Sequence, residues 1–244
     1  RCCLRLGVEL SAQCCCGELY RARLVVGRLW EGVECIVYIA VITGSNEPVH
    51  HGVLGMILLT RLPGMTILAP SAYRELQQMF EDALAVTDGP VAIRWAKTPA
   101  PHVGWDEVGR GLSARQVKAA SDDRTVCLLG AGKMLAAAEE AADLLAADGI
   151  HATVWDPRCI RPLDVAMLDD AAGHRLVVTV EDGFREGGFG TGVMDDLSSR
   201  SPRTEVAVLG VPVAHHPHGQ VDDLLASFGL DGPGVAATVR SRLG

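Results

Sequence analysis

The chain has 244 residues, 48% of them hydrophobic, and a formal net charge of −8. Its length and apolar content suffice for one large or two modest α/β domains. The acidic balance argues against a broad basic surface for nucleic acid, and no apolar run approaches the roughly 18 residues of a membrane span. We therefore expect no nucleic-acid partner, no membrane partner and a cytoplasmic location.

Residues 1–34 are predicted to be a poorly patterned, cysteine-rich segment. Six of the eight cysteines lie within the first 35 residues, five of them in a CC and a CCC cluster, without a CxxC pair or a neighbouring histidine. This spacing favours neither a zinc site nor a disulfide framework. Because the chain begins at Arg1 rather than Met, we expect a fragment or a displaced reading frame.

Residues 35–100 are predicted to form part of an α/β domain. An apolar strand pattern ends at Ile42 and is followed by the polar loop TGSNEPVHHG, which contains His50. In an open α/β sheet, loops at the carboxyl ends of strands usually carry the ligand site. His50 is therefore a candidate functional residue, and an ordinary surface histidine is the alternative.

Two more strands are expected in this part, at residues 65–69 and 91–95. Ser71 follows the first of them and is expected to cap the next helix. The second strand is apolar except for Arg94. A guanidinium there suits bidentate binding of phosphate or carboxylate, and the alternative is an ion pair at the edge of the sheet.

Residues 101–123 are rich in proline and glycine and are predicted to be a linker, and residues 124–244 a second unit. In that unit, strand patterns alternate with helix patterns, which implies right-handed crossovers and a mostly parallel sheet. The strands are predicted at 126–129, 150–155, 176–180 and 206–209.

Two glycine-rich turns of the second unit could bind a ligand. Gly130-Ala131-Gly132 lacks the third glycine of a dinucleotide fingerprint, so nicotinamide binding is not favoured. The run EDGFREGGFGTG, residues 181–192, precedes a helix and could form an anion site. Because the acidic residues of this run would repel an anion, a tight strand-to-helix turn packed against a neighbouring subunit is favoured.

Several stretches, taken together and in this order, resemble the 1-deoxy-D-xylulose-5-phosphate synthases, which are thiamine-diphosphate enzymes of the transketolase superfamily. They are TGSNEPVHHG, LPGMTILAPS, TDGPVAIRWAK, LLGAGKMLAAAEEAADLL, VWDPRCIRPLD and VVTVEDGFREGGFGTGV. The resemblance covers about residues 36–244. It implies a partial pyrimidine-binding domain followed by a transketolase C-terminal domain with a mostly parallel sheet.

The resemblance also implies a reaction and roles for individual residues. The family condenses pyruvate with glyceraldehyde 3-phosphate and releases CO2, for isoprenoid and thiamine biosynthesis, with thiamine diphosphate and Mg²⁺ as cofactors. By motif position, His50 resembles the histidine that handles substrate protons, and Arg94 the residue that binds the substrate phosphate. Lys97 stands where a second basic residue is expected, whereas Asn46 replaces an acid of the family pattern.

The domain that holds the diphosphate and Mg²⁺ in the family has no counterpart in this sequence. We therefore expect the C-terminal part of such a synthase, inactive alone, which associates as a homo-oligomer or with a separate cofactor domain. Two alternatives stay open: a non-catalytic oligomerisation or regulatory module, and one subunit of a split enzyme of the 2-oxo-acid dehydrogenase or transketolase type.

Overall fold

The structure is a computed structural model that describes residues 25–29, 33–39, 52–96, 98–120, 124–214, 216 and 219–244. Of residues 25–29 and 33–39 it describes the backbone. The predicted site residues His50, Asn46 and Lys97 lie outside the described residues.

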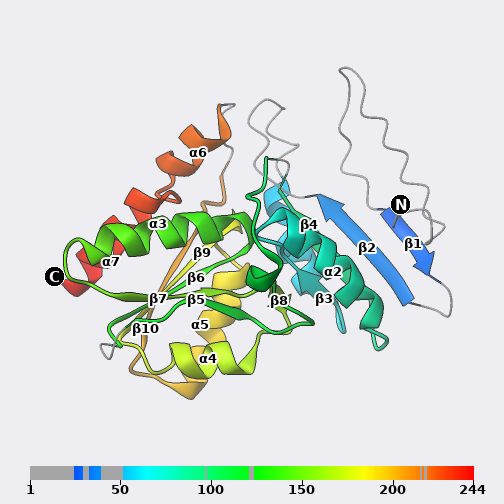
Figure 1. The fold of residues 1–244 in the computed structure, drawn as a ribbon, viewed down its shortest axis with the longest axis horizontal. Helices are drawn as coiled ribbons and strands as arrows, with labels where there is room; N and C mark the ends of the chain where they lie inside the picture. Colours follow the sequence, from blue (N-terminus) through cyan, green and yellow to red (C-terminus); the bar gives the residue numbers. More distant parts are fainter. Residues whose placement is uncertain are drawn as a thin grey trace.

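The described strands form two five-stranded sheets, which Figure 1 shows side by side. The order in the first sheet is β1 (Val25–Leu29), β2 (Val33–Ile39), β4 (Val91–Trp95), β3 (Thr66–Leu68) and β8 (Cys159–Arg161). Strands β2, β4 and β3 are parallel, and the two outer strands pair antiparallel with their neighbours.

The second sheet is parallel except at one edge. Its order is β10 (Glu205–Val211), β9 (Leu176–Phe184), β6 (Val126–Gly130), β7 (Ala152–Asp156) and β5 (Arg115–Lys118), with β5 antiparallel to β7. The strand–helix alternation in the sequence thus yields the parallel sheet that it predicts. Strand β5 lies in the segment predicted as a linker and pairs with the second sheet.

Helices cover both faces of the second sheet (Figure 1). On one face lie α3 (Leu135–Ala146) and α7 (Gly232–Leu243), and on the other lie α4 (Val165–Ala171) and α5 (Phe189–Arg200). The alanine-rich helix α3 buries one apolar face, made of Leu135, Ala138, Ala142 and Leu145. Side-chain oxygens of Asp164 and Asp231 cap α4 and α7 by accepting from Met167 N and Gly234 N.

The remaining helices are α1 (Gly55–Thr60), α2 (Tyr73–Ala85) and α6 (Val221–Ser227). Short 3₁₀ turns lie at Gly52–Leu54 (η3), Trp105–Glu107 (η4) and Gly132–Met134 (η5). Among the described residues, none of the helices is long and apolar enough to cross a membrane.

The two sheets share a hydrophobic core. Met56 and Leu59 of α1 and Ile67 of β3 belong to the same buried cluster as Phe189 and Val193 of α5. Strand β8 comes from the second half of the chain and completes the first sheet by pairing with β3. The two halves therefore pack as one body.

The prediction that Ser71 caps the following helix is wrong. Helix α2 begins after Ala72, which provides no side-chain cap. The Ser71 hydroxyl instead donates to Asp156 Oδ2 at the end of β7, at 2.6 Å. A buried carboxylate competes successfully for this hydroxyl, because an unpaired buried charge is costly.

Candidate functional site

The carboxyl ends of the parallel strands of both sheets meet at the boundary between the two halves. Ala69, just after β3, donates its backbone N–H to the Arg158 carbonyl at 2.8 Å. Gly132, just after β6, has a φ of 56°, and Ala69 and Pro70 lie against it. Because ligands of open α/β sheets bind beyond the carboxyl ends of strands, we expect a ligand site at this boundary.

Arg94 of β4 and Asp182 of β9 form a buried ion pair across this boundary. The Arg94 Nη1 donates to Asp182 Oδ1, and the two side chains are 3% and 1% exposed. The alternative considered from the sequence, an ion pair at a sheet edge, is half right. Arg94 is paired, but β4 lies between β2 and β3 inside the sheet.

One edge of the Arg94 guanidinium has no partner among the described residues. Its Nε and Nη2 are buried and have no hydrogen-bond partner in the structure, and neither does Asp182 Oδ2. Buried donors normally have partners, and each unsatisfied one destabilises the fold by about 1–3 kcal/mol. The Nε–Nη2 edge is also the one that can bind two oxygens of a phosphate or carboxylate side by side. Arg94 is therefore equipped to bind an anion in addition to Asp182.

Glu181, next to Asp182, fills the amino end of α5. Its Oε2 accepts from Phe189 N at 3.1 Å, and its Oε1 from Gly190 N at 2.9 Å. Burial raises the pKa of Glu181 to about 7, although these two N–H groups and the nearby Arg94 act to lower it. The glycine-rich run thus receives a carboxylate of its own chain, so the amino end of α5 is not free for an external anion.

Lys133 of η5 adds a second cation to this region. Burial lowers its pKa, and the nearby Arg94 lowers it further, whereas Asp182 and Asp222 raise it. Nothing in the sequence pattern around Lys133 distinguishes it from a surface lysine, because only the packing of the first half against η5 brings it to the boundary.

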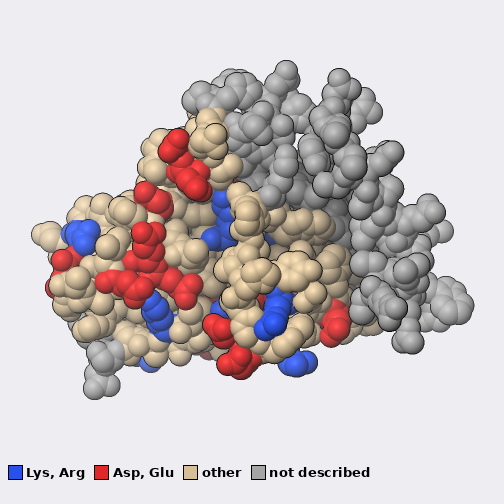
Figure 2. Space-filling model, turned by 45° about the horizontal axis from the view of Figure 1, so that its top comes forward, with Lys and Arg blue, Asp and Glu red and all other residues tan. Residues whose placement is uncertain are grey.

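Charged side chains are interspersed on the face seen in Figure 2. Acidic groups gather in several places there, basic ones lie singly between them, and the described residues form no broad basic patch in this view. This surface fits the acidic composition and offers no continuous track for a phosphate backbone.

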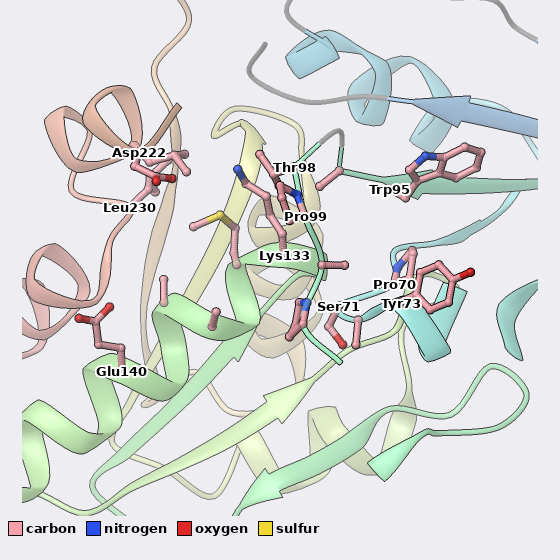
Figure 3. A pocket seen from close by; sticks show the side chains of 18 of the residues that line it. Pro70, Ser71, Tyr73, Trp95, Thr98, Pro99, Lys133, Glu140, Asp222 and Leu230 are labelled. Atoms are coloured by element: carbon pink, nitrogen blue, oxygen red, sulfur yellow. The ribbon is translucent and has the colours of Figure 1, made fainter. Parts of the chain in front are cut away.

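A cavity of about 680 Å³ opens beside Lys133. Its walls come from the segments that follow β3 and β4, from the start of α3, and from α6 and the start of α7. Figure 3 shows Lys133 projecting toward Thr98 and Pro99, with Asp222 and Leu230 on the opposite wall. Such a volume lies within the usual range for small-molecule sites.

A second polar cluster, around Arg158, fastens α2 to the other half of the chain. Arg158 is fully buried and donates from Nε to Glu75 at 2.9 Å and from Nη2 to Asp82 at 3.1 Å. Its Nη1 donates to the carbonyls of Gly111 and Ser113. Its φ of 55° lies in the left-handed region, which is uncommon for a residue other than glycine. Apart from charged residues at helical spacing on α2, no sequence pattern predicts this role.

The described residues offer no site that fits Mg²⁺ with a diphosphate. The cluster of potential metal ligands among them consists of Cys127, Asp170 and His174. Burial raises the pKa of the Cys127 thiol above its usual range, and both His174 ring nitrogens already contact Asp170 O or Thr153 Oγ1. Mg²⁺ prefers several hard oxygen ligands, so this cluster does not match it.

The chain is similar in sequence to proteins of the transketolase type. Residues 115–235 match the family model described as the C-terminal domain of transketolase. The chain is 37% identical over 203 residues to a 1-deoxy-D-xylulose-5-phosphate synthase of Chlorobium phaeovibrioides, and 38% identical over 199 residues to that of Leifsonia xyli subsp. xyli. Each match covers 82% of this chain but 32% and 30% of the relative, so the chain spans about a third of the curated relatives' length.

A solved structure is similar over most of the chain. It is described as a split gene transketolase, an inactive beta4 tetramer, and it aligns with a TM-score of 0.72 and 26% identity. The alignment covers 85% of this chain and 65% of that one. The family model and this structure confirm the predicted fold class, with a mostly parallel second sheet.

Proposed function

Because the chain belongs to the transketolase superfamily and is similar to the C-terminal third of 1-deoxy-D-xylulose-5-phosphate synthases, we propose that it is the C-terminal part of such a synthase. In this proposal it contributes to the condensation of pyruvate with glyceraldehyde 3-phosphate to 1-deoxy-D-xylulose 5-phosphate and CO2. The product would serve isoprenoid and thiamine biosynthesis.

The observation that carries the proposal is the unused edge of Arg94. Its two buried donors without partners suit the phosphate of glyceraldehyde 3-phosphate, which accepts such a bidentate contact. His50 is proposed to move substrate protons, since the imidazole pKa lies near neutrality. Lys97 is proposed to assist in substrate binding, and Asn46 to occupy the place of an acid.

Thiamine diphosphate and Mg²⁺ are proposed to be bound mainly by a separate cofactor domain. One observation supports this: a similar solved structure is described as a split gene transketolase. We accordingly propose that the chain is inactive alone and works as a homo-oligomer or in association with a separate cofactor domain. The split-enzyme alternative is favoured over a purely structural module because a module has no use for the free Arg94 edge.

A chimera tests this function. The part of the Leifsonia xyli relative that precedes the matched region is fused to residues 36–244 of this chain, and product formation is measured with both substrates. We expect turnover by the chimera, and neither turnover nor heat of thiamine diphosphate and Mg²⁺ binding with the chain alone. Turnover by the chain alone would refute its incompleteness, and an inactive but folded and cofactor-bound chimera would refute the proposed reaction.

Within the chimera, Arg94→Lys separates the role of Arg94 from general effects. Lysine keeps the charge but loses the planar edge, so we expect the KM for glyceraldehyde 3-phosphate to rise about tenfold, with a smaller change for pyruvate. Arg240→Lys, at an exposed ion pair with Asp148, is the matched control. Equal KM values for the two variants would contradict phosphate binding by Arg94.

Asn46→Asp in the same chimera tests the departure from the family pattern. A carboxylate can accept a proton and supply negative charge, which an amide cannot. We therefore expect a higher kcat for the variant, measured under saturating substrates, with Asn46→Gln as the control. An unchanged kcat would count against a role for this position in the reaction.

A further inference from the structure

Lys133 is a cation without a partner at the edge of a cavity. Among the described parts of the chain, no side chain lies within hydrogen-bond or ion-pair distance of its ammonium group. It is partly buried and lines the cavity of about 680 Å³. By contrast, Lys118 of β5 bonds Asp143 Oδ1 at 2.5 Å and Glu139 O at 3.3 Å. A desolvated ammonium without a partner is costly, so the position of Lys133 requires an explanation.

Lys133 lies in the same electrostatic environment as Arg94. The η5 turn, which carries Lys133, contacts β4, which carries Arg94, and Trp95, next to Arg94, lines the same cavity as Lys133. Asp182 pairs with Arg94 and raises the pKa of Lys133. Arg94 brings two buried donors without acceptors, and Lys133 brings up to three more. Two cations with spare donors therefore lie near each other at the boundary, one from each half of the chain, and of the two only Arg94 is paired with Asp182.

We infer that Lys133 is a second anion-binding residue of the Arg94 site, so that a phosphate or carboxylate is held by one cation from each half of the chain. This inference rests on the proposed function, and it assigns to the C-terminal unit a direct part in substrate binding. The cavity beside Lys133 then accommodates the rest of a small phosphorylated molecule.

The carboxylates that line the same cavity do not prevent anion binding. Asp231 is engaged as the cap of α7, whereas Glu140 and Asp222 are exposed. Water and salt screen exposed charges far more than partly buried ones. Asp222 has a supporting effect, because it raises the pKa of Lys133 and so favours the charged ammonium against the effect of burial.

The test measures binding of inorganic phosphate to the full chain by calorimetry at low ionic strength. Lys133→Gln removes the charge, and we expect it to weaken phosphate binding about tenfold or more. Lys133→Arg keeps the charge and should bind within about threefold of the unsubstituted chain. Lys118→Gln, which removes a lysine of the same unit that already has partners, should leave phosphate binding unchanged.

Arg94→Lys and the double variant with Lys133→Gln show whether one anion contacts both residues. If one anion contacts both residues, the phosphate affinity of the double variant should fall by a smaller factor than the product of the two factors measured for the single variants. Phosphate binding by Lys133→Gln equal to that of Lys118→Gln overturns the inference but leaves the proposed function, which the chimera tests by turnover. A loss confined to Lys133→Gln, with Arg94→Lys unaffected, also overturns it, since the cavity would then be a separate site. Absence of saturable phosphate binding by the unsubstituted chain overturns it as well.

Discussion

At the scale of single residues, the boundary between the two halves depends on carboxylates kept away from water. Asp156, at the end of β7, is fully buried and accepts from the Ser71 hydroxyl at 2.6 Å and from Arg158 N at 3.0 Å. Burial raises its pKa to about 7, more than these two hydrogen bonds lower it. The carboxylate form is thus accommodated only at the expense of stability.

Asp156→Asn should remove this dependence on pH. Because the folded-state pKa of Asp156 is raised, the folded protein binds more protons than the unfolded chain between about pH 4 and pH 7, and the free energy of unfolding falls as pH rises through that window. Asparagine keeps both hydrogen bonds, since its amide can donate to Ser71 Oγ and its oxygen can accept from Arg158 N. We expect the variant to be more stable than the parent at pH 8, by at most about 4 kcal/mol.

Urea unfolding at a series of pH values measures this difference. Burial also raises the pKa of Glu181 to about 7, and Glu181 remains in the variant. The free energy of unfolding should therefore depend less steeply on pH in the variant than in the parent, but the dependence should not vanish. Asp223→Asn, at an exposed position of α6, controls for the substitution itself. Identical slopes for Asp156→Asn and the parent would contradict the assignment.

At the scale of elements, α5 packs closely on its sheet because Gly190 in its first turn has no side chain. A Cβ on Gly190 would lie 2.2 Å from Thr179 Oγ1 and 2.6 Å from Val208 Cγ1, whereas a Cβ on Gly192 would meet nothing closer than Leu163 Cδ1 at 3.9 Å. The turn is therefore tight, as the sequence predicts, and it is built against β9 and β10 of the same chain, whereas packing against a neighbouring subunit stays a prediction.

The pair Gly190→Ala and Gly192→Ala tests this packing with the same chemical change. We expect Gly190→Ala to lower the free energy of unfolding by about 1–3 kcal/mol, because the new methyl group overpacks a buried contact. Gly192→Ala should be neutral or stabilising by up to about 1 kcal/mol, since alanine favours helix. Thermal and urea unfolding of the two variants provide the measurement, and equal effects would contradict close packing at Gly190.

The elements that could be predicted are those whose signal is local. Alternating strand and helix patterns predict the second sheet, and Arg94 stood out because a charged residue interrupts an apolar strand. Strand β8 could not be predicted, since three residues between prolines carry no periodicity and their partner β3 is far away in the chain. Lys133 and Arg158 were missed for the same reason, because their roles arise from contacts between distant segments.

At the scale of the whole molecule, Arg158 joins the two halves of the chain. It comes from the second half, yet it pairs with Glu75 and Asp82 on α2 of the first half. Gly109 N also donates to Glu75 Oε1 at 2.8 Å, which draws the connecting segment into the same cluster. We expect the two halves to unfold together while this cluster is intact.

Arg158→Met should separate the unfolding of the two halves. The substitution leaves two buried carboxylates without a cation, so we expect the free energy of unfolding to fall by about 3–5 kcal/mol. The loss of stability should affect mainly α2, which carries both carboxylates. Hydrogen exchange at increasing urea should show α2 losing protection before α3 in the variant, and both together in the parent. Arg161→Met, at an exposed position, is the control. Simultaneous loss of protection in α2 and α3 of Arg158→Met would contradict the proposed coupling.

The pairing of β8, from the second half of the chain, with β3 of the first sheet also has a consequence for synthesis on the ribosome. Chains are made from the amino end, so β2, β3 and β4 leave the ribosome well before residues 159–161 exist. Until then the outer side of β3 presents unpaired N–H and C=O groups, which other strands can recruit. During translation, the first half therefore has to wait for its last strand, and we expect this interval to be the period in which a chaperone is most useful to the nascent protein.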